Sequence, residues 1–208
     1  MTEQRGEEKT MKRIWVCVLA VMLAVILPVS ALALTSTSGN YAPAKSGSAR
    51  DYVLSFSREH ELGNNDTYPI YSAPALNAVR GANGKASMHT SGGGDSAGWY
   101  GAWLLMRYEK SSGGYRVGWV PKTELNMRGI QATRNVRFAC WTVSLDQNCM
   151  LTDDPLMESE ILAYASAGEE LTYLAYYCYN GGKEYAYVQG ELDGRPVCGF
   201  IPFDAIAW

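Results

Sequence analysis

Few side chains in this chain have the type and spacing needed for catalysis. The sequence holds two histidines and five cysteines. A papain-like cysteine peptidase needs a cysteine ahead of a histidine, and the only cysteine before His60 or His89 is Cys17, inside an apolar N-terminal run. A serine triad using either histidine lacks a supporting G-x-S-x-G motif. We therefore expect that the protein is not an enzyme.

Adjacent acids and a glycine-rich segment also fall short of a catalytic pattern. Asp153-Asp154 and Glu169-Glu170 would point to opposite faces of a strand, so we interpret both pairs as turn residues. The segment SGGGDSAG, residues 91–98, lacks the Gly-Lys-Ser/Thr that contacts phosphate and metal in a P-loop. Its glycines predict a flexible loop tip.

Four cysteines follow the N-terminal run: Cys140, Cys149, Cys178 and Cys198. They contain no C-x-x-C spacing, and no histidine follows His89, so neither a metal site nor a cofactor is expected. In an oxidising compartment the four can form disulfides in three ways. Alternatively, all four are small buried side chains, and the sequence leaves both alternatives open.

Aromatic residues stand above the background of the composition. Trp99, Tyr100 and Trp103 flank the glycine-rich segment, and Tyr71 and Tyr108 lie in neighbouring predicted strands. Most such rings fill the core, but alternate residues of a strand face outward. These five are the predicted ligand-binding residues, lining a shallow groove for a peptide or glycan.

The elements that must position these rings occur almost in duplicate. GYRVGWVP (residues 114–121) and GRPVCGFIP (residues 194–202) both run Gly, Arg, Val, then Gly, an aromatic, a β-branched residue and Pro. Gly118 and Gly199 are 81 positions apart, an interval that suits a small domain plus its linker. The spacing predicts a duplicated unit.

Duplication makes specific positional predictions. We expect Gly118 and Gly199 to be equivalent, and likewise Trp119 and Phe200, with each aromatic ring packing at the end of its own barrel. The second motif carries one extra residue, Cys198, which predicts a β-bulge between Val197 and Gly199.

Short strands are predicted along the whole chain after residue 50. The run GAWLLMRYE, residues 101–109, is apolar enough to be buried on both faces. A helix over residues 171–179 is rejected because Tyr-rich stretches flanked by Gly favour strands. The other predicted strands lie in residues 51–56 (an edge strand), 68–74, 85–90, 115–121, 138–143, 161–165 and 185–202, the last as a hairpin turning at Leu192-Asp193-Gly194.

Residues 1–33 are predicted to be an export signal. A basic Met11-Lys12-Arg13 precedes the apolar run of residues 14–27, Pro28 and an A-x-A pattern at Ala31 and Ala33. The alternative is an uncleaved membrane anchor, since residues 14–34 are long enough to span a bilayer. The native start is Met1 or Met11. An apolar helix over residues 13–30 and little order before about residue 50 are expected.

Charge and composition limit the partners. Without residues 1–33 the chain keeps 14 basic and 18 acidic residues, with no basic cluster to follow a nucleic acid backbone. Its glycine and tyrosine content is typical of a globular all-β protein. We expect a secreted or cell-envelope protein that contacts a membrane only through its N-terminal segment, if that segment is retained.

These features together resemble a bacterial SH3-like (SH3b) domain protein. The resemblance rests on the export signal, a Trp-Leu-Leu strand, a Gly-rich turn, and the endings Gly118-Trp119-Val120 and Gly199-Phe200-Ile201. The usual Leu-Asn-Val-Arg-Ser start appears only as LNAVR, residues 76–80, and the second copy has LMES instead. The resemblance implies two small SH3-like barrels in tandem. The implied organisation is signal 1–33, linker 34–66 with an edge strand, first barrel 67–125, connecting strand segment 126–148 and second barrel 149–208.

Two functions from different classes remain open. The first is a non-enzymatic extracytoplasmic module that binds cell-wall peptide, glycan or an envelope protein through aromatic grooves. The second is a structural or accessory envelope protein that makes protein–protein contacts without a small ligand.

Overall fold

The computed structural model describes residues 47–60, 66–81, 83–89, 94–110, 113–125, 134–155 and 161–208, which lie in one compact unit spanning Leu32–Trp208. Regular structure in these ranges is β-strand, apart from the short 3-10 segments η1 (Ala49–Asp51) and η2 (Phe203–Ala205). The all-β prediction is therefore confirmed. No helix in the described ranges is long and apolar enough to cross a membrane. The predicted export signal and its apolar helix lie outside the described residues.

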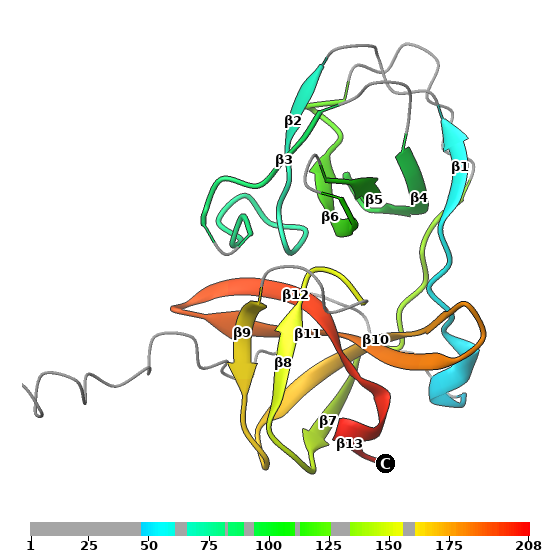
Figure 1. The fold of residues 1–208 in the computed structure, drawn as a ribbon, viewed down its shortest axis with the longest axis vertical. Helices are drawn as coiled ribbons and strands as arrows, with labels where there is room; N and C mark the ends of the chain where they lie inside the picture. Colours follow the sequence, from blue (N-terminus) through cyan, green and yellow to red (C-terminus); the bar gives the residue numbers. More distant parts are fainter. Residues whose placement is uncertain are drawn as a thin grey trace, which may run out of the picture. The chain divides into compact units, whose positions relative to one another are not determined.

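The first six strands form two sheets (Figure 1). One has the order β1-β4-β5-β6, and the other is the pair β2-β3. Tyr71 and Trp119 join them, because each main-chain N–H donates to the carbonyl of the other residue, at 2.9 and 2.7 Å. We call residues 57–125 the first repeat. Its strands are β1 (Ser57–His60), β2 (Thr67–Pro69), β3 (Ser87–His89), β4 (Gly94–Tyr100), β5 (Trp103–Glu109) and β6 (Tyr115–Pro121).

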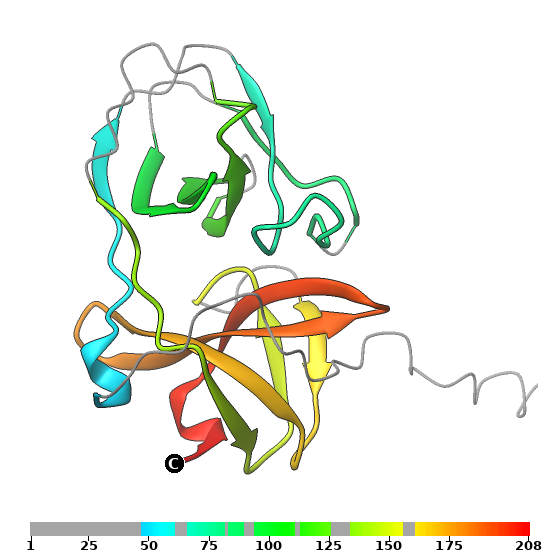
Figure 2. The same ribbon diagram turned by 180° about the vertical axis from the view of Figure 1, so that it is seen from behind.

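The remaining seven strands form one curled sheet, seen from two sides in Figures 1 and 2. Its order is β13-β7-β10-β11-β12-β8-β9. We call residues 141–207 the second repeat. Its strands are β7 (Trp141–Leu145), β8 (Cys149–Thr152), β9 (Ile161–Ala165), β10 (Glu170–Tyr179), β11 (Lys183–Leu192), β12 (Arg195–Pro202) and β13 (Ile206–Ala207).

Most predicted strands are present. β10 confirms that residues 171–179 are a strand, and β5 is buried on both faces as expected: Leu104 and Leu105 are both 0% exposed. The predicted turn at Leu192-Asp193-Gly194 is confirmed by the positive φ angles of Asp193 and Gly194, which suit a two-residue hairpin turn. The prediction of an edge strand at residues 51–56 is wrong in its position. Those residues hold the end of η1 and an isolated bridge, and β1 begins at Ser57.

The loop tip predicted for residues 91–98 is wrong from Gly94 onward, because β4 begins there. Gly98 has a φ of 126°, and the pairing of β4 with β5 shifts between Ser96 and Gly98. A Cβ on Gly98 would lie 2.7 Å from the carbonyl oxygen of Arg134. Glycine is needed here for a bulged strand against which another segment packs closely, and not for a flexible loop.

The β-bulge predicted at Cys198 is also wrong. β11 and β12 pair in unbroken register, with Cys198 opposite Gln189. Because the 81-residue interval holds along the whole strand, Arg116 corresponds to Val197, opposite Gly190, and the extra residue of the second motif is accommodated nearer the turn. A bulge does occur in each repeat, one strand earlier. The pairing of β10 with β11 shifts between Tyr173 and Ala175.

The predicted equivalence of the two Gly-aromatic motifs is confirmed by strand register. Trp119 pairs with Tyr71, and Phe200 pairs with Thr152. Phe200 lies 81 residues after Trp119, and Thr152 lies 81 residues after Tyr71, so the two pairs are equivalent. The rings themselves differ from the prediction. Trp119 and Phe200 do not pack at separate barrel ends but lie in one hydrophobic cluster.

The repeated glycine is explained by close packing at both sites. A Cβ on Gly118 would overlap Cγ2 of Ile70, and one on Gly199 would lie 2.6 Å from the carbonyl oxygen of Thr152. Any larger residue would push apart the strand and the segment it pairs with. The motif is therefore repeated because each repeat brings an equivalent segment against the strand that carries the motif, β6 in the first repeat and β12 in the second.

Replacing Gly199 by alanine should lower the free energy of unfolding by about 1–3 kcal/mol, the usual cost of overpacking a tight site. Urea denaturation monitored by tryptophan fluorescence measures the change. Gly182→Ala is the matched control, because a Cβ there meets no atom within 4 Å among those of the described chain. Equal stability changes in the two variants would contradict the packing account.

The two repeats share a core. One cluster of buried residues joins β5 and β6 to β10, β11 and β12, and includes Leu105, Trp119, Tyr187 and Phe200. Across it the indole N–H of Trp119 donates to the hydroxyl oxygen of Tyr187 at 3.0 Å. A second cluster lies within the first repeat, and the buried residues of a third lie within the second, apart from Val79 and Ala139.

Main-chain hydrogen bonds between the repeats are reciprocal. The N–H of Val117 donates to the carbonyl of Asp153 at 2.7 Å, and the N–H of Cys198 donates to the carbonyl of Ser72 at 3.0 Å. The 81-residue interval relates Val117 to Cys198 and Ser72 to Asp153. Each repeat thus donates from one position to a second position of the other repeat, and accepts at its own copy of that second position. Reciprocal contacts of this kind are typical of two-fold association. The repeats therefore associate as the two halves of an approximate dimer do.

The predicted domain boundaries and the SH3-like assignment stay predictions. The paired strands start with β1 and β7, ahead of residues 67 and 149 where the copies were expected to begin, and much of the predicted linkers lies outside the described residues.

Candidate functional site

Two of the predicted ligand-binding residues line a pocket of about 220 Å³ at the end of the β4–β5 hairpin. We call this pocket the aromatic cleft. It is lined by Ala73, Pro74, Ala75, Tyr100, Gly101, Ala102, Trp103, Gln189 and Pro196. The first repeat supplies most of the lining, and the second repeat supplies Gln189 and Pro196.

A tight turn brings Tyr100 and Trp103 together. Gly101 and Ala102 close the hairpin, and Tyr100 pairs directly with Trp103 across it. The main-chain N–H of Lys122 donates to the carbonyl of Ala102 at 2.7 Å and fixes the turn. Main-chain pairing therefore places these two lining residues opposite each other.

Tyr100 links the cleft to the shared core. Its ring centroid lies 6.4 Å from that of Trp119 and 5.4 Å from that of Phe138. Burial raises the pKa of its hydroxyl, and nearby Cys140 adds to the shift. The hydroxyl therefore stays protonated at neutral pH, and substitution of this ring affects packing as well as the cleft.

Trp103 continues into a row of half-buried side chains. Its ring meets that of Tyr71 edge-on at 5.4 Å, and the guanidinium of Arg80 lies 5.4 Å from the Tyr71 ring centroid. Arg80 is itself held by donation from its Nη2 to the carbonyl of Ala86 at 3.0 Å. Tyr71 and Trp103 thus form one aromatic edge beside the cleft, with a cation at its far end.

The wall from the second repeat was missed by sequence reasoning. Gln189 is only 5% exposed, and its Oε1 accepts a hydrogen bond from Sγ of Cys198 at 3.6 Å. That bond fixes one end of a buried amide at the cleft. The only sequence signal was a glutamine within the apolar strand YAYVQGEL, and nothing in it indicated which neighbour the strand would face.

The other two predicted residues lie elsewhere. Tyr108 is 6% exposed in the core cluster of the first repeat, so its ring offers a ligand little surface. Trp99 follows strand alternation onto the face opposite Tyr100, where the ammonium of Lys122 lies 5.5 Å from its ring centroid. The structure therefore gathers Tyr71, Tyr100 and Trp103, and leaves Trp99 and Tyr108 apart from them.

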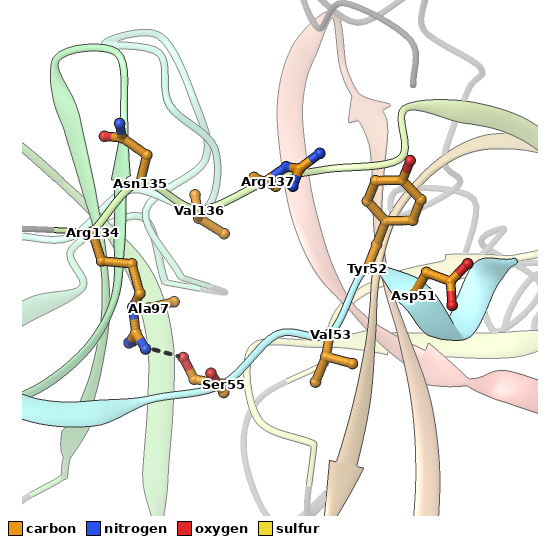
Figure 3. A pocket seen from close by; sticks show the side chains of 9 residues that line it. All are labelled: Asp51, Tyr52, Val53, Ser55, Ala97, Arg134, Asn135, Val136 and Arg137. Carbon is orange, nitrogen blue, oxygen red and sulfur yellow. Dashed lines mark hydrogen bonds between the residues drawn. The ribbon is translucent and has the colours of Figure 1, made fainter. Parts of the chain in front are cut away.

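A second, more polar pocket of about 360 Å³ lies between two chain segments (Figure 3). We call it the linker slot. Arg134 crosses one end, where its Nη2 donates to the carbonyl oxygens of Ser96 at 2.9 Å and Ser55 at 3.4 Å. Sequence reasoning did not find this pocket. It is lined by Asp51, Tyr52, Val53, Ser55, Ala97, Arg134, Asn135, Val136 and Arg137.

The four cysteines are free thiols. Burial raises the pKa of Cys140 to about 11, and burial together with Glu169 raises that of Cys149 to about 11. Both therefore remain protonated and weakly nucleophilic at neutral pH. In the part of the chain that the structure describes, no three His, Cys, Asp or Glu side chains are grouped to hold a metal ion.

No family model matches the chain, and no curated protein matches it. Among solved structures, NlpC2 from Trichomonas vaginalis is 15% identical, with 73% of this chain and 49% of that chain covered and a TM-score of 0.27. NlpC1 from the same organism is 12% identical, with coverage of 80% and 52% and a TM-score of 0.26. This chain thus spans about half the length of either neighbour. Backbone similarity at this level assigns no function.

Proposed function

We propose that this chain is a non-enzymatic extracytoplasmic binding module whose aromatic cleft holds a unit of cell-wall peptide or glycan. One observation carries the proposal: Tyr71 and Trp103 form an aromatic edge beside a cleft that also contains the buried amide of Gln189. Flat rings next to a fixed polar group are the arrangement by which proteins orient sugars and peptide side chains.

The size of the cleft favours part of a polymer over a free small molecule. Its volume of about 220 Å³ is below the roughly 300–1,000 Å³ of pockets that enclose drug-sized ligands. One sugar ring or one peptide side chain fits this space. A long polymer could place one such unit in the cleft while the rest lies over the row formed by Tyr71 and Arg80.

Two further observations support binding in preference to catalysis. The raised pKa values of Cys140 and Cys149 disfavour the nucleophilic thiolate. The carboxylate of Asp153 contacts Arg116 at 2.7 Å, which occupies it in an ion pair between the repeats. An extracytoplasmic location is part of the proposal and rests on the sequence pattern of residues 1–33.

The proposal predicts that the mature chain, residues 34–208, sediments with purified cell wall and that Trp103→Ala weakens this binding about tenfold. The reason is loss of the apolar area of one contact ring, worth about 1–2 kcal/mol after ordering costs. Tyr164→Ala is the matched control, because it removes an exposed ring on β9.

Circular dichroism and thermal melting establish that each variant is folded, and Trp103→Phe retains a ring if Trp103→Ala does not fold. A folded Trp103→Ala protein that binds cell wall as tightly as the parent contradicts the cleft assignment. If the parent chain ignores cell wall and recovers a specific envelope protein instead, the accessory-protein alternative is favoured.

A further inference from the structure

The linker slot lies between two segments that pair with β10 and β4 of the other repeat, beyond the stretches of those strands that pair with β7 and β1. Ahead of the first repeat, the N–H of Leu54 donates to Tyr176 and the N–H of Tyr176 donates to Tyr52, at 2.7 and 2.8 Å. Ahead of the second repeat, the N–H of Val136 donates to Trp99 and the N–H of Trp99 donates to Arg134, both at 2.9 Å. Each segment is therefore a short outer strand.

The outward edges of both strands have main-chain groups available. In an extended chain the N–H and C=O of successive residues point in opposite directions, so Val53 and Asn135 turn theirs away from β10 and β4. Within the described residues, neither Val53 nor Asn135 makes a main-chain hydrogen bond. Both line the slot, and Val53 is 58% exposed, high for an apolar side chain. Two residues that line the slot thus make no main-chain hydrogen bond within the described residues.

Charge favours one class of occupant. Arg134 and Arg137 line the same side of the slot, and Figure 3 shows them on the segment opposite Ser55 and Val53. The single acid in the lining is Asp51, whose Oδ2 already accepts the N–H of Ser48 at 2.7 Å. Arg137 is exposed. A carboxylate entering the slot would meet an excess of positive charge.

We infer that the linker slot binds an extended acidic peptide segment of a partner protein by β-strand addition. The peptide main chain pairs with the edges at Val53 and Asn135, and a carboxylate side chain reaches Arg137. Main-chain pairing supplies affinity and the arginine supplies selectivity, as in other cases where a peptide joins an open sheet edge. This site is separate from the aromatic cleft and does not depend on cell-wall binding.

An array of ten-residue peptides tests the inference. The peptides alternate Val or Thr with Glu, and matched sets replace every Glu by Lys or methylate the main-chain nitrogens. Fluorescently labelled full chain, purified in mild detergent, should bind the acidic set. Both matched sets should bind at least tenfold more weakly, because they reverse the charge or remove the main-chain donors.

Two exposed arginines give a matched pair of variants. Arg137→Glu should weaken binding of the acidic set about tenfold and improve binding of the lysine set, whereas Arg195→Glu, with the same change in net charge, should alter neither. Equal binding of acidic and lysine peptides, undiminished binding of methylated peptides, or no binding to any set would overturn the inference. None of these outcomes bears on the cell-wall proposal, because that proposal is tested by sedimentation of the parent and Trp103→Ala proteins with cell wall.

Discussion

Replacing Trp119 by alanine should lower the free energy of unfolding by about 3–5 kcal/mol, the range for truncating a large buried aromatic. Trp119 is 0% exposed and lies within 6.4 Å, between ring centroids, of Tyr100 and Phe138. Its indole N–H also donates to Tyr187 in the second repeat. The substitution removes packing from both repeats at once, so they should lose stability together.

Urea denaturation followed by circular dichroism and by intrinsic fluorescence measures this effect, and coincident transitions indicate cooperative unfolding. Trp119→Phe retains a ring but loses the hydrogen bond, so it should cost less than Trp119→Ala. Two separated transitions, with the second repeat unchanged by the substitution, would show that the shared cluster does not couple the repeats.

Replacing Asp153 by asparagine should cost about 3–5 kcal/mol of unfolding free energy, because it removes the counter-charge that Asp153 supplies to the buried cation of Arg116. The side chain of Arg116, in the first repeat, is 10% exposed, and that of Asp153, in the second, is 5% exposed. Nε of Arg116 lies 2.7 Å from Oδ2 of Asp153. Glu184→Gln is the matched control. Its ion pair with Arg50 has the similar distance of 2.8 Å but is exposed at both ends, so its loss should cost far less than the loss of the buried pair.

A double variant separates the cost of an unpaired charge from a general packing defect. Arg116→Met together with Asp153→Asn should recover part of the stability lost in Asp153→Asn alone, since no buried cation remains. An additive loss in the double variant, or equal losses for Asp153→Asn and Glu184→Gln, would contradict this reading of the pair.

The strands could be predicted because alternation and glycine-bounded apolar runs are local signals. The hairpin of β5 and β6 and the strand β10 follow directly from them. The equivalence of Gly118 and Gly199 in the two repeats could be predicted from their spacing in the sequence alone. These predictions needed no knowledge of how the two repeats contact each other.

The features that were missed depend on contacts between the repeats. From the sequence alone Gly98 is interpreted as a loop residue. In the structure it is a strand residue onto which the segment after the first repeat packs. Asp153 and Asp154 lie in a bend as expected, but they are 5% and 0% exposed because they face the other repeat. No periodicity within a strand indicates which of its faces a second copy will cover.

The candidate site shows the same limit. Strand parity explains why Tyr108 shares the core cluster of Leu104 and Met106, while Leu105 faces the shared cluster. The sequence alone offered Trp99, Tyr100 and Tyr108 as equivalent aromatic residues. Only the arrangement of the repeats separates a ring at the cleft from a ring in the core.

The central claim is that the aromatic cleft is where cell-wall material binds, and the indole N–H signals of residues 34–208 test it most directly. Five tryptophans lie in that range, and Trp→Phe variants assign their nitrogen–proton resonances. On addition of soluble peptidoglycan fragments, the Trp103 signal should shift in a saturable manner. The Trp119 signal should stay in place, because its N–H is buried and bonded to Tyr187. An unchanged Trp103 signal at fragment concentrations that saturate binding would contradict the claim.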